Sequence, residues 1–206
     1  INKARNDGIT PLYAASEMGN VEVVRILLEN GADVNQGDNG GWSPLIIASL
    51  KGHVEVVKVL LEKGAYINKA NSAGDTPLYV ASQEGNEDIV RILLEKGAEI
   101  NKANNVGQTP LMIAVSFGDF EVVEALLEYG ANLNVRTDEG YTAFDLVNDG
   151  PPDTRSKIET LLKRYKLRPI VEKNVERQKE RKHFEEIMEN EKFNDFQNKH
   201  ETMQYL

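Results

Sequence analysis

The sequence predicts an all-α fold, a solenoid of short helix-turn-helix units, and three observations predict it. A Thr-Pro-Leu or Ser-Pro-Leu triplet recurs every 33 residues. Two glycine positions and one asparagine position recur at the same interval. Such a period is typical of arrays in which each unit buries its apolar face only against its neighbours. The triplets begin at Thr10, Ser43, Thr76 and Thr109, and the other recurring residues are Gly19, Gly52, Gly85 and Gly118, Gly31, Gly64, Gly97 and Gly130, and Asn35, Asn68, Asn101 and Asn134.

Within the first unit, the residue types predict two helices. The Thr10 hydroxyl can cap a free N–H group, and Pro11 fits the first position of a helix that we expect to end before Gly19. Asn20 is expected to cap the second helix, which Gly31 would end in a left-handed conformation. The apolar face of this second helix comprises Val21, Val23, Val24, Leu27 and Leu28.

The pattern resembles the ankyrin repeat family, whose motif is G-x-T-P-L-H-x-A followed by G-x-x-x-V-V-x-x-L-L-x-x-G-A-x-x-N. Residues 8–15 read GITPLYAA, and residues 19–35 follow the second half of the motif. The resemblance implies an ankyrin-repeat solenoid with β-turn tips and a protein-binding role. The histidine of the motif is absent, so its usual bond to the neighbouring turn must be replaced or missing. Its positions hold Tyr13, Ile46, Tyr79, Met112 and Asp145.

The repeat register divides the chain into an array at residues 1–165 and an extension at 166–206. Residues 1–4 match residues 67–70, so we expect them to be the tail of a preceding repeat and the chain to be a fragment of a longer array. The last repeat is degenerate, with Ala143 in place of proline and a two-residue insertion near Pro151, as a terminal cap requires. The expected repeats span about residues 5–37, 38–70, 71–103, 104–136 and 137–165.

The extension at residues 166–206 lacks glycine and is rich in charged residues, which predicts helix after about Ile170. Its charges form blocks, one of them basic, at residues 177–182. Two interpretations stay open. The segment is a solvated helix or linker, or its basic block makes an intramolecular or oligomeric contact with the acidic array or docks on a partner helix.

Charge excludes some classes of partner. The net charge is −9, and residues 166–206 hold nine basic and nine acidic groups, so residues 1–165 hold 24 − 9 = 15 basic and 33 − 9 = 24 acidic groups. An acidic surface repels phosphate groups, which argues against nucleic acid and anionic membranes as partners. No run approaches the roughly 18 apolar residues of a membrane span. The absence of cysteine fits a reducing, intracellular location, cytoplasmic rather than nuclear.

No residue pattern indicates catalysis. His53 occupies a helix-capping position, and His183 and His200 have no metal-ligand spacing. The glycines recur at repeat turns, and none belongs to a phosphate-binding loop. We therefore expect no enzyme activity, no cofactor and no metal site.

The candidate binding residues lie at the turn tips and at the exposed ends of the first helices, which line a concave face in the ankyrin family. Trp42, the only tryptophan, is a candidate hot spot, with packing over Pro44 or a neighbouring tip as the alternative. The polar residues at the other turn tips favour a partner with some basic surface. The set comprises Ile9, Met18, Trp42, Leu50, Lys51, Asp75, Glu84, Gln108, Phe117 and Tyr141.

The expected function is therefore a protein–protein interaction scaffold or adaptor. Two alternatives stay open. The chain is a substrate-recruiting fragment of a larger multidomain enzyme, or it is a structural, oligomer-forming array with its C-terminal helix docked on it.

Overall fold

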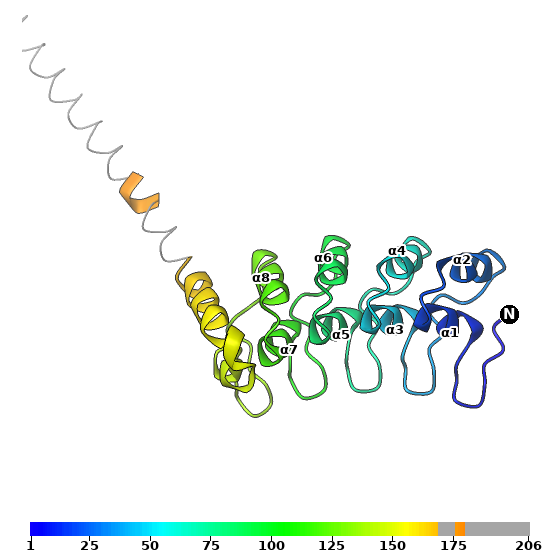
Figure 1. Ribbon diagram of the computed structural model, residues 1–206, viewed down its shortest axis with the longest axis horizontal. Helices are drawn as coiled ribbons and strands as arrows, with labels where there is room; N and C mark the ends of the chain where they lie inside the picture. The colour runs from blue at the N-terminus through cyan, green and yellow to red at the C-terminus, as the bar shows by residue number, and fades with distance from the viewer. Residues whose placement is uncertain (169–175, 180–206) are drawn as a thin grey trace, which may run out of the picture. The chain divides into compact units, whose positions relative to one another are not determined.

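The computed structural model describes residues 1–168 and 176–179 (Figure 1). The chain divides into two compact units, Ile1–Leu162 and Lys163–Leu206. In the first unit, four helical hairpins follow one another, as the periodicity predicts. The first helices of the hairpins are α1 (Pro11–Glu17), α3 (Pro44–Leu50), α5 (Pro77–Gln83) and α7 (Pro110–Phe117). The second helices are α2 (Val21–Glu29), α4 (Val54–Glu62), α6 (Glu87–Glu95) and α8 (Phe120–Glu128).

A fifth hairpin follows α8. It consists of the 3₁₀ helix η1 (Asp145–Asp149) and a helix at residues 152–168, whose last residues belong to the second unit. The helix predicted after about Ile170 falls mostly outside the described residues. Within that stretch, residues 176–179 are described, and they are helical. The two interpretations of the extension therefore lie outside the described part of the chain.

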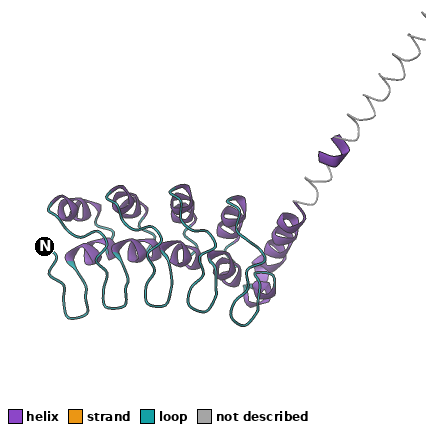
Figure 2. Ribbon diagram, turned by 180° about the vertical axis from the view of Figure 1, so that it is seen from behind, coloured by secondary structure: helices purple, strands orange, loops and turns teal. Residues whose placement is uncertain are grey.

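The array has two layers of helices and a row of projecting loops. Figure 2 shows the first helices side by side in one layer, the second helices in another, and the loops extending from the first layer. Each first helix contacts the next one along, and each second helix contacts its neighbour. The core lies between the layers and between neighbouring hairpins.

The triplet starts every first helix in the predicted way. Thr10, Ser43, Thr76 and Thr109 are extended residues whose hydroxyl oxygens accept the N–H of the residue three positions on, at 3.1 to 3.3 Å. The following proline takes the first helical position, where its missing N–H costs nothing. The predicted capping is confirmed.

The residues before the second helices do not cap them, and that prediction was wrong. Asn20, His53, Asn86 and Asp119 hold the N-cap position, but none of these side chains accepts a helix N–H. His53 Nε2 instead donates to the Glu17 carbonyl at 2.9 Å, and Asn86 Nδ2 donates to the Ser49 carbonyl at 3.0 Å. Both bonds join one hairpin to the preceding one.

Glycine is required where these side chains cross the preceding hairpin. Gly19 has φ of +71°, and a Cβ there would lie 2.6 Å from His53 Nδ1. Gly118, with φ of +80°, is also crowded by the following hairpin, since a Cβ there would collide with Pro151 Cδ and lie 2.6 Å from Thr154 Oγ1. Thr154 follows Asp119 by 35 residues instead of the usual 33. The two-residue insertion of the last repeat therefore lies before Thr154.

The projecting loops are β-turns, which we call fingers 1 to 5. They span residues 5–9, 38–42, 71–75, 104–108 and 137–141, and each is closed by an N–H···O bond of 2.9 to 3.1 Å between its first and last residues. A backbone bond also joins each finger to the next, from Asn39 N to Asp7 O at 3.1 Å through to Asp138 N to Val106 O at 3.3 Å. The fingers therefore form one continuous hydrogen-bonded row.

A second row of inter-hairpin bonds runs through the recurring asparagines. Asn35 Oδ1 accepts the Tyr66 N–H at 2.8 Å, and Asn2 Oδ1 accepts the Asp33 N–H at 2.9 Å in the same way. Asn2 thus makes the same contact with its following hairpin as Asn35 does one repeat later. Lys69 adds a bond from Nζ to the Asn35 carbonyl at 2.7 Å.

The second helices gain their burial from their neighbours. Val56 and Val59 of α4 are 0% and 1% exposed. Their counterparts in α2, Val23 and Ile26, are 45% and 56% exposed, because α2 has a neighbour on one side only within the described structure. A hairpin of this size cannot bury its own apolar face.

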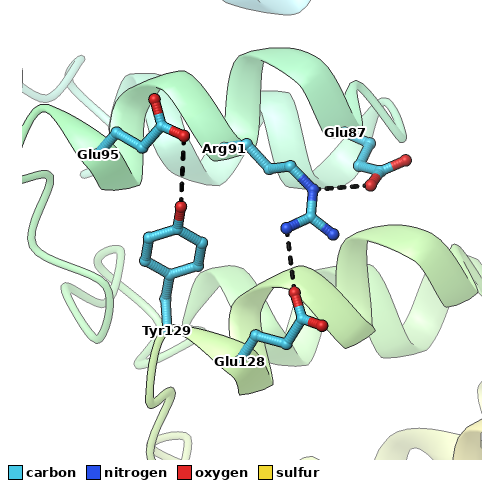
Figure 3. Close-up of polar contacts among 5 residues, drawn as sticks. All are labelled: Glu87, Arg91, Glu95, Glu128 and Tyr129. Atoms are coloured by element: carbon cyan, nitrogen blue, oxygen red, sulfur yellow. Dashed lines mark hydrogen bonds and ion pairs between the residues drawn. The ribbon is translucent and has the colours of Figure 1, made fainter.

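An ion-pair network adds to the contact between α6 and α8. Figure 3 shows Arg91 between Glu87 of its own helix and Glu128 of the next, with N···O distances of 2.8 and 3.0 Å. The hydrogen bond with Glu87, and then that with Glu128, raise the pKa of Arg91 above its ordinary value. Tyr129 Oη also lies 3.5 Å from Glu95 Oε1. Because these groups are solvent-accessible, each pair contributes only about 0.5 kcal/mol.

Two of the five residues at the position of the motif histidine, Tyr79 and Asp145, make hydrogen bonds through their side chains. Tyr79 is 5% exposed, and its hydroxyl donates to Gln108 Oε1 of finger 4 at 2.9 Å, so a bond to the neighbouring turn is replaced here. Burial, and then the charge of Asp75, raise the pKa of Tyr79 to about 12. In the fifth repeat the donor and acceptor exchange places. Asp145 Oδ2 accepts both the N–H and the hydroxyl of Thr142 at 2.7 Å, whereas in the other repeats the Thr or Ser hydroxyl is the acceptor. These bonds lower the pKa of Asp145.

Replacing Asp119 by asparagine is expected to stabilise the array. A carboxylate cannot donate the bond that Asn86 gives to Ser49, whereas Asp119→Asn provides a donor for the Ser82 carbonyl. We expect the free energy of unfolding at pH 7, measured by urea denaturation, to rise by about 1 kcal/mol.

The pH dependence of this gain tests its cause. Burial, followed by repulsion from Glu121 and Glu84, raises the pKa of Asp119, so the folded state binds its proton more tightly than the unfolded chain does. Wild-type stability relative to Asp119→Asn is therefore highest at low pH and falls as pH rises through that pKa. The gain from Asp119→Asn should shrink on acidification. Asp33→Asn, at an exposed loop residue, is the charge-matched control, and an equal gain there would contradict the explanation.

Removing the Tyr79 hydroxyl should destabilise the array. Tyr79→Phe leaves Gln108 Oε1 without its donor, and we expect a loss of about 1 kcal/mol in urea unfolding. Tyr13→Phe is the matched control, because Tyr13 has the same place in the first repeat and none of the described residues accepts a hydrogen bond from its hydroxyl. Equal losses in the two variants would refute the assignment of this bond.

Candidate functional site

Four predicted binding residues form one row of exposed side chains. Met18, Lys51, Glu84 and Phe117 lie at the C-terminal ends of the four first helices, 33 residues apart, and all four are exposed. Met18 and Phe117, at the two ends of the row, are 65% and 50% exposed although both are large and apolar. We call these four residues the exposed row.

The predicted residues at the ends of the fingers are less accessible. Ile9, Trp42, Asp75 and Gln108 are half-buried, and only Tyr141 is exposed, at 48%. Trp42 and Leu50 pack against a buried cluster of Ile46, Tyr79, Val80 and Ile113. The tryptophan therefore contributes to the packing between hairpins and leaves part of its surface accessible.

Two of these finger residues are engaged within the array. The Asp75 carboxylate accepts Asn71 Nδ2 through Oδ2 at 3.2 Å and Asn104 Nδ2 through Oδ1 at 3.1 Å. Gln108 accepts the Tyr79 hydroxyl, as described above. Any partner of these two side chains competes with bonds within finger 3 and with bonds that join finger 4 to finger 3 and to α5.

The structure also forms a pocket of about 440 Å³ between fingers 4 and 5 and η1. Two predicted residues, Gln108 and Tyr141, line it, and they are joined by residues outside the predicted set. Val106, Asp138 and Glu139 are at finger tips, a position that the repeat register identifies. Leu146 and Asp149 come from η1, and no sequence signal indicated that this helix would form a wall.

Two carboxyl groups in the described part of the chain have shifted pKa values. No group of three or more His, Asp or Glu residues in that part of the chain is placed to hold a metal ion. The shifted carboxyl pKa values belong to Asp119 and Asp145, and each follows from a structural contact: burial between hairpins and bonds to Thr142. No helix in the described ranges combines the length and apolar composition that crossing a membrane requires.

Comparison with known proteins agrees with the geometry of the hairpins. Residues 1–71 and 67–137 match ankyrin repeats (3 copies), which covers more than half of the 206 residues. No curated protein matches the chain. With capped hairpins, turn fingers and inter-hairpin bonds all at the same interval, the chain belongs to the ankyrin repeat family.

Proposed function

We propose that this protein is a non-enzymatic scaffold or adaptor that binds a protein partner on the concave face formed by its fingers and first helices. Ankyrin repeats in general are protein–protein interaction modules. The observation that carries the proposal here is the exposed row. Its members project from helix ends that the stacking fixes in place, and none of them is needed for the core.

The composition of the exposed row suits protein recognition. Large apolar side chains at exposed, rigid positions are typical hot spots, and truncating one costs about 2 kcal/mol of binding. Met18 and Phe117 are such residues, and Lys51 and Glu84 lie between them. We infer a partner surface with apolar contacts at two separate points and polar groups between.

Rigidity supports the same proposal. The backbone bonds from finger to finger and the hydroxyl caps of the first helices hold the face in one conformation. A pre-formed face loses little conformational entropy when it binds. The acidic balance of residues 1–165 favours a partner that offers some basic surface, and the lack of cysteine is consistent with work inside the cell.

The test is affinity capture with the full chain and a variant of the row. Met18→Glu/Phe117→Glu should reduce recovery of the specific partner at least about tenfold, because a charge at each apolar contact is costly. The readout is quantitative mass spectrometry of the captured proteins, followed by titration of the purified partner. Circular dichroism should show an unchanged fold, since neither residue is buried.

The matched control is Ile26→Glu/Tyr66→Glu, which introduces the same charges at two other exposed apolar residues, in α2 and in the loop after α4. It should retain every partner. If the control loses the partner and the row variant keeps it, the binding face lies elsewhere and the proposal fails.

A further inference from the structure

The pocket between fingers 4 and 5 and η1 is lined by both apolar and acidic side chains. One part of its wall is apolar: Val106 is 55% exposed and Tyr141 is 48% exposed, and the third apolar lining residue, Leu146, is buried. Its volume of about 440 Å³ is within the range of small-ligand sites. An extended side chain fits a space of this size more readily than a folded domain does.

The polar part of the wall is negatively charged. Asp138, Glu139 and Asp149 all line the pocket, and within the described residues no Lys or Arg lies within ion-pair distance of them. All three are exposed, so they stay hydrated until a partner arrives. They remain available for a cation from outside.

The nearby cations of the array are already engaged with backbone carbonyls. Arg136 Nη1 donates to the Gly140 carbonyl at 2.6 Å. Arg155 Nη2 donates to the Asn148 and Gly150 carbonyls at 2.8 and 3.1 Å. These contacts hold finger 5 and the end of η1 in position without filling the pocket.

The walls are also pre-formed. The Thr137 N–H donates to the Tyr141 carbonyl at 2.9 Å, and Thr137 Oγ1 accepts the Tyr141 N–H at 3.2 Å. Asp138 is joined to Val106 of finger 4 by its backbone N–H. The aromatic ring and the carboxylates are thus presented from a turn whose backbone is fixed.

We propose that this pocket is a binding site for an arginine side chain of a partner protein. An aliphatic stem lies along Val106 and Leu146, and the planar guanidinium stacks on the Tyr141 ring while it pairs with the carboxylates of Asp138 and Glu139. Guanidinium is suited to both contacts, because it is weakly hydrated, planar and able to donate in parallel to carboxylate oxygens. The inference rests on the proposed function and names the chemistry of one contact within it.

Two other occupants are less suitable. A metal ion needs converging ligands, and the described residues include no such group. Lysine supplies a compact, strongly hydrated charge that gains less from an aromatic face than arginine does. The two cations are therefore distinguishable by experiment.

The test uses the full chain and a short acetylated, amidated peptide, Gly-Ser-Arg-Ser-Gly. Matched peptides carry lysine or the uncharged analogue citrulline in place of arginine. In ¹⁵N-resolved NMR titrations, the arginine peptide should shift the amides of Val106 and residues 138–141. The citrulline peptide should bind at least about tenfold more weakly, since it lacks the charge that the carboxylates pair with. Binding of citrulline and arginine with equal affinity, or shifts located elsewhere, would overturn the proposal.

Variants separate the two parts of the site. Tyr141→Ala should weaken the arginine peptide several-fold and reduce its advantage over the lysine peptide, because stacking favours guanidinium. Asp138→Asn/Glu139→Gln should weaken both cationic peptides about tenfold. The control Glu29→Gln/Glu62→Gln removes the same number of negative charges at the exposed ends of α2 and α4. It should leave the affinity for both cationic peptides unchanged. A matching loss in this control would mean that the array attracts cations non-specifically, and the pocket assignment would be wrong.

The result is distinguishable from that of the exposed-row experiment. The peptide titration maps the pocket without knowledge of the partner, and the capture experiment changes residues outside the pocket. If the row variant loses its partner while the arginine peptide does not bind, the proposed function stands and this inference falls. If the peptide binds while the row variant keeps its partner, the pocket stands and the row does not.

Discussion

The structure depends on the inability of a two-helix hairpin to bury its own apolar face. Val56 of α4 is fully buried, whereas Val23, the same residue type at the same repeat position, is almost half exposed in α2. The difference is the presence of a hairpin on the second side. Stability in such an array is therefore a sum over interfaces between neighbours. Residues that maintain those interfaces have little freedom to recognise a partner, which leaves recognition to the side chains between them.

Polar contacts follow the same rule. The bonds of His53, Asn86 and Asn35 join one hairpin to the next, and the backbone bonds between fingers do the same. Each is a modest contribution when taken alone. Together they fix the spacing of the fingers, so that a face built from several repeats behaves as a single surface. A rigid surface of that kind binds without first having to order its loops.

Periodicity predicted the fold almost completely, because it identifies which residues occupy equivalent positions. The hydroxyl caps, the helix starts at proline and the turn fingers all followed from local chemistry at those positions. The bond partners of His53 and Asn86 could not be predicted in that way, since they depend on carbonyls of the preceding hairpin. The same limit applies to the candidate site. Asp75 and Gln108 were expected to be accessible tips, but their partners lie in neighbouring repeats and only coordinates reveal them.

The departure of the fifth repeat from the pattern has a consequence for where chemistry can collect. In the other repeats a proline and a hydroxyl cap start a regular α-helix. With Ala143 instead of proline, and with Asp145 accepting from Thr142, the chain forms the short η1 helix instead. Leu146 and Asp149 then face fingers 4 and 5 across a pocket. The departure from the motif therefore brings an aromatic ring, Tyr141, into one accessible space with carboxylates that have no ion-pair partner among the described residues.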